Sequence, residues 1–401
     1  MEENKNKILN VPTLRFPNYS GEWQVSPMGK VCTFHKGYGI SKDNLSNDGT
    51  PCILYGELYT TYKTAIARCI KSKTSLDPTT LFHSRKNDVI IPCSGETSED
   101  IATSVCIPYD DILLGGDLTV IRCDLDGAFL SNQINSVRKY DIARIAQGKS
   151  IVHLQADELK KIYIAYPTIE EQQKISGFID KIDELIEVQK KIISDLKVLK
   201  KELCNKLFNS SLCNKTIEIR QVADIYGGYA FNSKAYISDG KYKIVTIGNV
   251  TGDKYISGNY NRIDILPDNI QEQQILNNGD ILISLTGNVG RISIVDGDNY
   301  LLNQRVAKLN VKNNLIKAYI YQYLSNSSFE KDMSNEGQGA AQKNIKNEDI
   351  LSYIIRIPTN QTYLEKIAGL LSTYDKLIAN EESISTNLYL KKCFLLNAMF
   401  I

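Results

Sequence analysis

The sequence is poor in the residues that metal sites and disulfide frameworks need. It holds three histidines and nine cysteines in 401 residues, and no two cysteines are spaced as C-x-x-C. An odd number of cysteines without that spacing argues against a disulfide scaffold and against a zinc ribbon, and it suits a reducing cytoplasm. We therefore expect neither a metal site nor a structural disulfide.

Signatures of catalysis and of membrane insertion are also missing. The absence of any Pro-Pro pair excludes the [DN]-P-P-[YF] loop with which an adenine methyltransferase grips a flipped base. The G-K-S at 148–150 lacks the first glycine of a P-loop, because position 143 is alanine. No apolar run approaches the roughly 18 residues of a membrane span, and the first ten residues are polar. We expect a soluble, cytoplasmic protein that binds no cofactor and is not an enzyme on its own.

Neither sign of charge is in excess. Lys+Arg 47 against Asp+Glu 46 leaves a formal charge of +1. A domain that binds nucleic acid through its overall charge would be clearly basic. Any nucleic-acid surface on this chain must therefore be local.

The sequence does contain an internal duplication. Residues 167–208 align with 358–400: Pro167 and Pro358 are 191 positions apart, and after a one-residue insertion the offset stays at 192. The preceding segments match more faintly, with KGYGI at 36–40 over GGYAF at 227–231 and DVIIPCSG at 88–95 over DILISLTG at 280–287. Self-similarity of this kind indicates a repeated structural unit, here a globular unit followed by a helix. The shared positions include Pro167/Pro358, Lys174/Lys366, Gly177/Gly369, Asp183/Asp375, Ile186/Ile378, Lys200/Lys392, Asn205/Asn397 and Phe208/Phe400.

The two helices are the clearest structural prediction. In each copy, apolar residues recur alternately four and three positions apart, which is the heptad pattern of a coiled coil. We predict that the helices pair with each other, and that each is about 60 Å long at 1.5 Å per residue. The first seam comprises Ile175, Ile179, Ile182, Ile186, Gln189, Ile193, Leu196, Lys200, Leu203 and Leu207, and the second comprises Ile367, Leu371, Tyr374, Ile378, Glu381, Ser385, Leu388, Lys392, Leu395 and Met399.

Polar residues interrupt the two seams at matching places, Lys200 in the first and Lys392 in the second. A polar residue at a seam position lowers stability and specifies the alignment of the helices. We interpret the two lysines as a register device, and from the sequence alone we expect leucine at either position to raise the stability of the helix pair.

The globular units read as mixed α+β. Short β-branched runs between clusters of Gly, Asn and Asp predict strands at 89–93, 118–123, 242–247, 280–285 and 291–296. Apolar residues at helical spacing predict a helix at 316–324.

Several motifs resemble the specificity subunit of a bacterial Type I restriction-modification system. They are PTLRFPNYSGEWQ at 12–24, PTIEEQQKISGFIDKID at 167–183 and LKVLKKELCNKLF at 196–208, together with the duplication itself. In the first of these, Leu14 to Pro17 is the specific part; in the second, it is Pro167 with Glu171, Gln172 and Ile175. The second copy departs from the pattern, since 359–362 read TNQT in place of the acidic element.

The resemblance implies a fold and a set of partners. Members of the family carry two mixed α/β target-recognition domains separated by two long helices that form an antiparallel coiled coil, with an internal pseudo-twofold repeat. Each domain reads one half of a split, asymmetric sequence of double-stranded DNA, and the helices hold modification subunits, two being expected, which recruit restriction subunits. On this basis we expect domains at 1–166 and 210–357, and helices at 167–209 and 358–401. The paired helices would act as a ruler that spans at most about 18 base pairs.

Base reading needs polar side chains on loops that a sheet holds in place. The matching loops of the two copies supply candidates for DNA contacts, whereas the glycines at 37, 39, 95, 227, 228 and 287 are expected to provide turns. In the first half the candidates are Lys36, Tyr38, Lys42, Tyr55, Glu57, Tyr59, Ser94, Glu96, Thr97 and Lys149. In the second half they are Tyr229, Phe231, Asn232, Lys234, Asn249, Thr286, Asn288, Arg291, Gln304, Arg305, Gln342 and Lys343.

Two other interpretations stay open at this stage. The chain could be a twofold coiled-coil adaptor with peptide-binding end domains, in which case it would show no salt-dependent binding to DNA. It could also be an enzyme whose active site has no recognisable motif, in which case the purified chain alone would show turnover.

Overall fold

The computed structural model describes residues 10–148, 152–336 and 343–401. Lys149 and Gln342, two of the candidate contacts, lie outside these residues. The chain forms two compact units: the first comprises 1–190 and 383–401, and the second comprises 191–382. Two long helices, α7 (Ile169–Phe208) and α11 (Gln361–Met399), each contribute one half to either unit. Among the residues described, no helix is long and apolar enough to cross a membrane.

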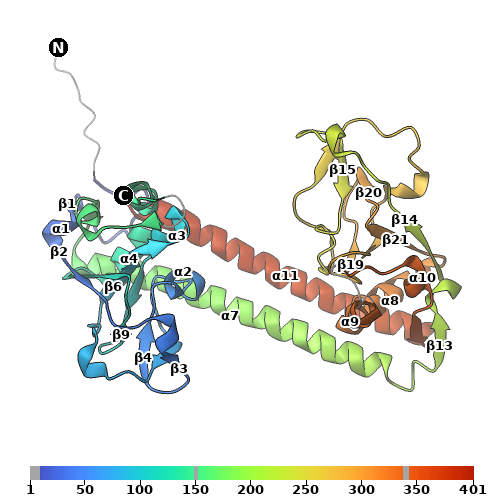
Figure 1. Ribbon diagram of the computed structural model, residues 1–401, viewed down its shortest axis with the longest axis horizontal. Coiled ribbons are helices and arrows are strands. Elements are labelled where there is room, and N and C mark those ends of the chain that lie inside the picture. The colour runs from blue at the N-terminus through green and yellow to red at the C-terminus, as the bar shows by residue number, and fades with distance from the viewer. Residues whose placement is uncertain (1–9, 149–151, 337–342) are drawn as a thin grey trace, which may run out of the picture. The chain divides into compact units, whose positions relative to one another are not determined.

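A four-stranded antiparallel sheet lies at the centre of the first unit (Figure 1). Its order is β2 (Cys32–Lys36), β10 (Leu118–Cys123), β6 (Asp88–Pro92) and β8 (Val105–Ile107). Every residue of β6 is buried, as its continuous apolar run leads one to expect for a strand covered on both faces. Helices α3 (Ser98–Ile101), α4 (Gly127–Asn135), α5 (Lys139–Ile145) and α6 (Ala156–Leu159) share a buried apolar cluster with Val89 and Ile91 of β6, so they cover one face of this sheet.

The remaining elements of the first unit are short. A second sheet has the order β3 (Leu45–Ser46), β5 (Ser72–Thr74), β4 (Thr50–Ile53) and β9 (Leu113–Leu114). Two strand pairs complete the unit, β1 (Gln24–Pro27) with β12 (Tyr163–Tyr166) and β7 (Ser94–Gly95) with β11 (Val152–His153). Helices α1 (Met28–Val31) and α2 (Glu57–Thr60) connect these pieces.

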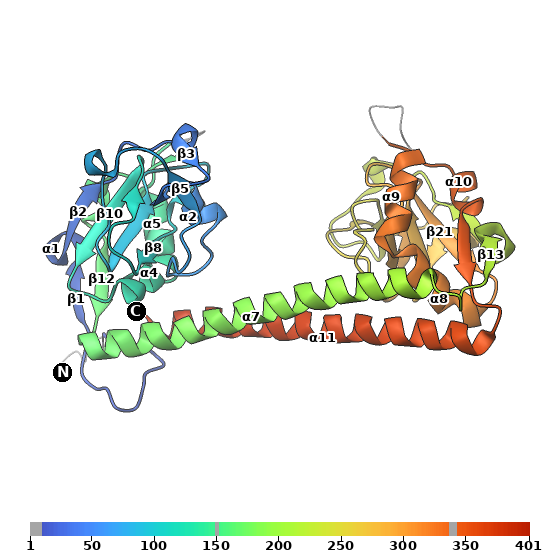
Figure 2. The ribbon, with the colours of Figure 1, turned by 90° about the horizontal axis from the view of Figure 1, so that it is seen from below.

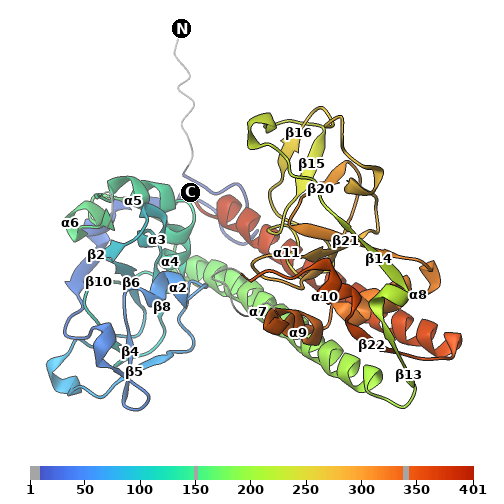
Figure 3. The same cartoon turned by 45° about the vertical axis from the view of Figure 1, so that its right-hand side comes forward.

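The second unit repeats the central sheet with the order β14 (Ala223–Gly227), β21 (Val306–Val311), β18 (Ile281–Ser284) and β19 (Ile292–Ile294). A further sheet, β16 (Asn261–Ile263), β15 (Tyr242–Val245), β20 (Tyr300–Leu302) and β17 (Ile275–Leu276), lies on one side of it (Figure 3). Strand β13 (Lys215–Glu218) pairs with β22 (Ile354–Ile357), and α8 (Asn314–Leu324), α9 (Ser327–Glu336) and α10 (Asn347–Leu351) complete the unit.

The two central sheets share one register. In the first unit, Thr119 lies opposite Lys36 on one side and Ile91 on the other. In the second unit, Ala307 lies in the same way between Gly227 and Ile283. The position of each residue in one sheet therefore has a defined counterpart in the other. Both sheets are followed by an N-capped helix: the Asp126 side chain accepts a hydrogen bond from Phe129 N in one unit, and the Asn313 side chain accepts one from Leu315 N in the other.

Within each unit, α7 and α11 lie side by side and run in opposite directions (Figure 2). In the first unit, Ile175 packs with Met399, and in the second unit Phe208 packs in one cluster with Leu364. All residues of the two predicted seams are buried or half-buried. The predicted fold class is confirmed: two mixed α/β units, two long helices that form an antiparallel coiled coil, and an internal repeat.

Each seam lysine forms an ion pair across the helix pair. Lys392 Nζ lies 2.6 Å from Asp183 Oδ1 in the first unit, and Lys200 Nζ lies 2.5 Å from Asp375 Oδ1 in the second. The carboxylates are 6% and 9% exposed, so both are charges removed from water. Removing one partner would leave the other buried and unpaired, which costs about 3–5 kcal/mol. The seam pattern alone led us to expect that leucine at Lys200 or Lys392 would raise the stability of the helix pair. Because of these ion pairs, we now expect leucine to lower it.

Candidate functional site

The central sheets end in equivalent backbone arrangements. In the first unit, Cys93 N donates to Asp117 O at 2.7 Å, and Leu154 N donates to Cys93 O at 2.9 Å. In the second unit, Leu285 N donates to Arg305 O at 3.0 Å, and Ile345 N donates to Leu285 O at 3.0 Å. The same backbone therefore presents side chains at matched places in both units.

The side chains on this shared backbone differ in chemistry. The first unit places Lys36, Ser94, Asp117 and His153 there, and the matched residues of the second unit are Gly227, Thr286, Arg305 and Asn344. A cation is replaced by a glycine at one position, and an anion by a cation at another. Because bases are distinguished by the pattern of donors and acceptors that they present, two such sets would select different sequences.

In the first unit these side chains border a cavity of about 470 Å³. Lys36, Ser94, Asp117 and His153 line it, with Thr119 at its wall. Ser94 Oγ lies 3.4 Å from His153 Nδ1, which brings a candidate contact together with a histidine that the sequence did not single out. Burial raises the pKa of the Cys93 thiol, so this side chain lines the cavity as a neutral group.

In the second unit, several candidates gather around the turn that follows β18. Gly287 N donates to Lys343 O at 3.0 Å, and Thr286 forms a β-bridge with Asn344. Asn288, Arg305 and Lys343 are exposed, whereas Thr286 is buried. Two of the charged side chains already have partners: Arg291 Nε lies 3.1 Å from Glu330 Oε1, and Lys343 Nζ donates to Ser334 Oγ at 2.8 Å.

The Gly-Tyr pairs of the repeat occupy equivalent loops beside the sheets. A Cβ at Gly37 would overlap the carbonyl oxygen of Gly115, and a Cβ at Gly228 would overlap that of Asn303, so both positions need glycine for close backbone approach. Tyr38 N donates to Leu114 O at 3.1 Å, and Tyr229 N donates to Leu302 O at 2.8 Å. The two tyrosines therefore leave their sheets from the same place.

The surroundings of the two tyrosines differ. Tyr38 is half exposed and packs edge-on against Phe82 at 6.1 Å between ring centroids. Tyr229 packs against Phe231 at 4.9 Å, and its hydroxyl donates to Asn269 Oδ1 at 2.7 Å. Aromatic and hydroxyl groups at one position are thus presented differently by the two units.

Other candidates have local roles or stand apart. Glu57 accepts hydrogen bonds from Leu54 N and Ser72 Oγ, Thr97 caps α3, and Asn232 accepts from Lys234 N. Asn249 is buried and holds the loop at 257–259 through its amide. We leave these side chains out of the proposed interface because they satisfy neighbouring backbone groups. Lys42, Lys234, Glu96 and Gln304 are exposed, Tyr55 is half-buried, and Tyr59 lines a separate cavity that Lys392 borders.

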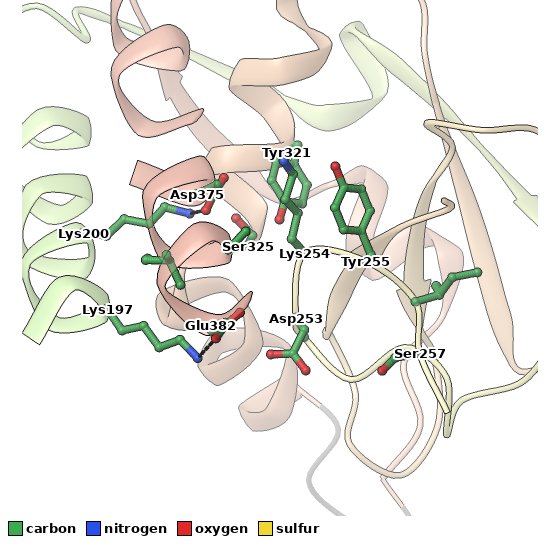
Figure 4. A pocket seen from close by; sticks show the side chains of 14 residues that line it. Lys197, Lys200, Asp253, Lys254, Tyr255, Ser257, Tyr321, Ser325, Asp375 and Glu382 are labelled. Carbon is green, nitrogen blue, oxygen red and sulfur yellow. Dashed lines mark hydrogen bonds and ion pairs between the residues drawn. The ribbon is translucent and has the colours of Figure 1, made fainter. Parts of the chain in front are cut away.

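The helix pair of the second unit forms one wall of another cavity, of about 470 Å³ (Figure 4). Lys200 extends toward Asp375 at its edge, and Lys197 Nζ lies 2.7 Å from Glu382 Oε1. Gln322 of α8 donates to Asp375 Oδ2 at 2.5 Å, so the buried carboxylate also ties the helix pair to the globular part of the unit. In the first unit, Arg68 has the corresponding role through its ion pair with Asp180.

The outer faces of the long helices carry exposed apolar side chains at heptad spacing. On α7 these residues are Phe178, Leu185, Ile192 and Leu199, and on α11 they are Leu370, Leu377 and Ile384, all between 39% and 55% exposed. The fourth position on α11 is Lys391. Because a second apolar stripe at this spacing is what a further helix would pack against, we define these seven residues as the outer stripe.

A family model for the Type I restriction modification DNA specificity domain matches the chain twice, over residues 20–198 and 214–389. The chain belongs to this family. It holds two copies of the specificity domain, each made of a globular part and most of the long helix that follows it, and its role is in DNA specificity.

Two solved structures share the fold of this specificity protein. The S subunit of a Type I restriction-modification system from M. genitalium gives a TM-score of 0.60 at 16% identity, covering 98% of this chain and 99% of that chain. A chain from a structure described as the basis of complex assembly and conformational transition of the type I R-M system gives 0.57 at 16% identity, covering 94% of this chain and 96% of that chain.

Proposed function

We propose that this chain reads a bipartite, asymmetric site in double-stranded DNA for a Type I restriction-modification complex. The domains at 1–166 and 210–357 would each read one half-site, and the helices at 167–209 and 358–401 would set the gap between them. The observation that carries the proposal is the shared sheet register with different side chains at its end, Lys36, Ser94, Asp117 and His153 against Gly227, Thr286, Arg305 and Asn344. Two readers of unlike sequences need a common scaffold and different contacts.

The residues we propose for DNA contact lie at the ends of the central sheets and on the Gly-Tyr loops. Lysine and arginine there would contact phosphates or guanine, and the neutral polar groups would contact other base edges. From the candidates of the first half we retain Lys36, Tyr38, Lys42 and Ser94, and add His153. From those of the second half we retain Tyr229, Phe231, Lys234, Thr286, Asn288, Arg291, Arg305 and Lys343, and add Asn344.

We further propose that the outer stripe binds modification subunits, and that the assembled complex recruits restriction subunits. These half-exposed apolar side chains recur at heptad spacing on each helix, and they would lose their contact with water against an amphipathic helix of a partner. Phe16 already covers part of Phe178, with 5.8 Å between ring centroids, so the chain itself closes one end of the stripe on α7. Catalysis in this proposal belongs to the partner subunits, and the complex acts in the cytoplasm, where the chromosome lies.

The experiment is to express the chain with its modification subunit in a host without adenine methylation and to map methylated adenines across the genome. The proposal requires one motif with two unlike specific parts and an unspecified gap. Binding of the purified complex to duplexes that carry the motif should weaken as salt rises, because phosphate contacts release counterions. A contiguous motif, or no motif from a complex that is soluble and intact, would overturn the proposal.

A further inference from the structure

Asp117 and Arg305 occupy the same place in the two units. Each immediately precedes the second strand of its central sheet, β10 or β21, and the carbonyl of each accepts a hydrogen bond from the residue that follows the neighbouring strand, Cys93 or Leu285. The registers of these strands agree, since Leu118 lies opposite Pro92 and Val306 lies opposite Ser284. The two units therefore carry side chains of opposite charge at equivalent positions of the backbone.

Both side chains are exposed and make no hydrogen bond or ion pair within the described parts of the chain. Lys36 lines the same cavity as Asp117, and Arg122, further along β10, forms an ion pair with Asp88 at 2.8 Å. In the second unit, Lys308 pairs with Asp280 at 2.7 Å, and Arg291 pairs with Glu330. Within the described residues, the hydrogen-bonding capacity of the Asp117 and Arg305 side chains is therefore unused.

The backbone at Asp117 adds a second observation. Its φ of +57° lies in the left-handed region, which glycine adopts without steric cost and which other residues adopt less readily. Aspartate and asparagine tolerate this conformation better than most side chains. This position therefore suits aspartate or asparagine, which decides the choice of the variant below.

We propose that Asp117 and Arg305 are base-specific contacts, each in the half-site of its own domain, an inference that rests on the proposed function above. A carboxylate accepts a hydrogen bond from the N4 amino group of cytosine, and a guanidinium donates two to O6 and N7 of guanine in the major groove. Asp117 then selects cytosine in the half-site that the first domain reads, and Arg305 selects guanine in the half-site that the second domain reads.

The test uses the full chain in complex with its modification subunit, with Asp117→Asn and Arg305→Gln as separate variants. Asparagine keeps the left-handed conformation and the size of aspartate, so the fold is maintained while the carboxylate is lost. Glutamine favours adenine over guanine. Lys215→Gln, at an exposed lysine on β13, is the matched control for loss of one positive charge.

The expected result is a change at one position of one half-site in each variant. Asp117→Asn should relax a cytosine in the first half-site, and Arg305→Gln should replace or relax a guanine in the second. Affinity for the parent sequence should fall about ten- to a hundred-fold in each case. The other half-site and the gap should stay unchanged, and Lys215→Gln should leave the motif as it is.

Three results would count against the inference in different ways. If affinity falls equally for all sequences and the salt dependence of binding becomes shallower by about one unit for Arg305→Gln, this residue contacts phosphate rather than a base. If motif and affinity are both unchanged, neither residue reads DNA. If the complex without substitutions yields no bipartite motif, the proposed function itself is wrong. That failure is seen without either variant, so it is distinguishable from a failure of this inference.

Discussion

In the first unit, Asp183 on α7 pairs with Lys392 on α11, and in the second unit Asp375 on α11 pairs with Lys200 on α7. The same contact thus occurs twice with the two helices exchanged. At the ends of the sheets the units differ instead, with Asp117 in one where the other has Arg305. The two halves are therefore alike in the contacts that join α7 to α11. They differ in the exposed side chains at the ends of their sheets, where a ligand would be selected.

The largest effect is expected when the second half of the chain is removed. A fragment of residues 1–210 keeps all of α7 but lacks residues 383–401, which complete the first unit. We expect two fragments to dimerise, with the second half of each α7 in the place of those residues and with Lys200 of one copy paired to Asp183 of the other. Burial of the seam would stabilise the dimer by about 1.5–3 kcal/mol per apolar residue, before the entropy lost on association is subtracted.

Sedimentation of the fragment measures its oligomeric state, and the methylation map of the fragment with its modification subunit measures its specificity. A true twofold dimer should methylate a palindrome built from the first half-site and its inverted copy. The full chain is the control. A monomeric fragment, or a dimer that retains the asymmetric motif, would show that the two helices are not interchangeable.

A smaller but still large effect is expected from the buried ion pairs. Lys392→Leu should destabilise the protein by about 3–5 kcal/mol at neutral pH, because Asp183 is left as an unpaired buried carboxylate. The double variant Asp183→Leu/Lys392→Leu should recover most of this loss. Denaturant unfolding of both variants, and of the matched pair Asp375→Leu/Lys200→Leu, tests the equivalence of the two units.

The pH dependence of the single variant sharpens this test. Burial raises the pKa of Asp183, and the attraction of Lys392 opposes that rise. Because the folded-state pKa lies above the unfolded one, the ionisation of Asp183 costs stability: the cost is absent below the unfolded pKa, grows as the pH rises and is complete above the folded pKa. Without Lys392 the pKa should rise further, so the loss in Lys392→Leu should shrink as the pH is lowered. A loss that stays constant with pH would show that the lysine stabilises through packing of its methylenes.

Two neighbouring glycines, Gly227 and Gly228, differ in the space that a Cβ would find. Gly228→Ala should destabilise the second unit by about 1–3 kcal/mol because its Cβ would overlap the carbonyl of Asn303. Gly227→Ala is the matched control, since a Cβ there meets nothing within 4 Å. Thermal unfolding of the two variants measures the difference, and equal melting temperatures would contradict the close approach.

The smallest expected effect concerns the outer stripe. Leu185→Glu on α7 and Leu377→Glu on α11 should each weaken binding of a modification subunit by about 1–2 kcal/mol, because a charge replaces a contact that association would bury. Ile265→Glu is the control, since Ile265 is 83% exposed and follows β16 rather than belonging to either long helix. Titration with the modification subunit gives both affinities. Unchanged binding in both helix variants would place the subunits elsewhere.

The parts of the fold that could be predicted are those whose signal is local and repeated. The heptads of α7 and α11 extend over about ten turns and occur twice, so their pattern could be recognised. The apolar runs at 89–93, 118–123 and 280–285 became β6, β10 and β18, because a buried strand needs little beyond its own side chains.

The arrangement of the site depended on contacts between distant segments. His153 meets Ser94 through the pairing of β11 with β7, and Asp117 reaches the same cavity through the register of β10 against β6. Neither strand pairing has a local signal in the sequence, so His153 and Asp117 could not be selected as candidates. The ion pairs did leave a signal, since Asp183/Asp375 and Lys200/Lys392 are both among the repeated residues. Which aspartate meets which lysine could be recognised only once the register of the two antiparallel helices was known.

If the two long helices set the distance between two DNA-reading domains, lengthening both helices should widen the gap in the DNA motif. Adding one heptad after Lys190 in α7 and one after Glu382 in α11, the points where the two units meet along the chain, preserves the seam and lengthens each helix by about 10 Å. The methylation map of this variant should show the same two half-sites with a gap longer by about three base pairs. An unchanged gap, or altered half-sites at the original spacing, would contradict the account.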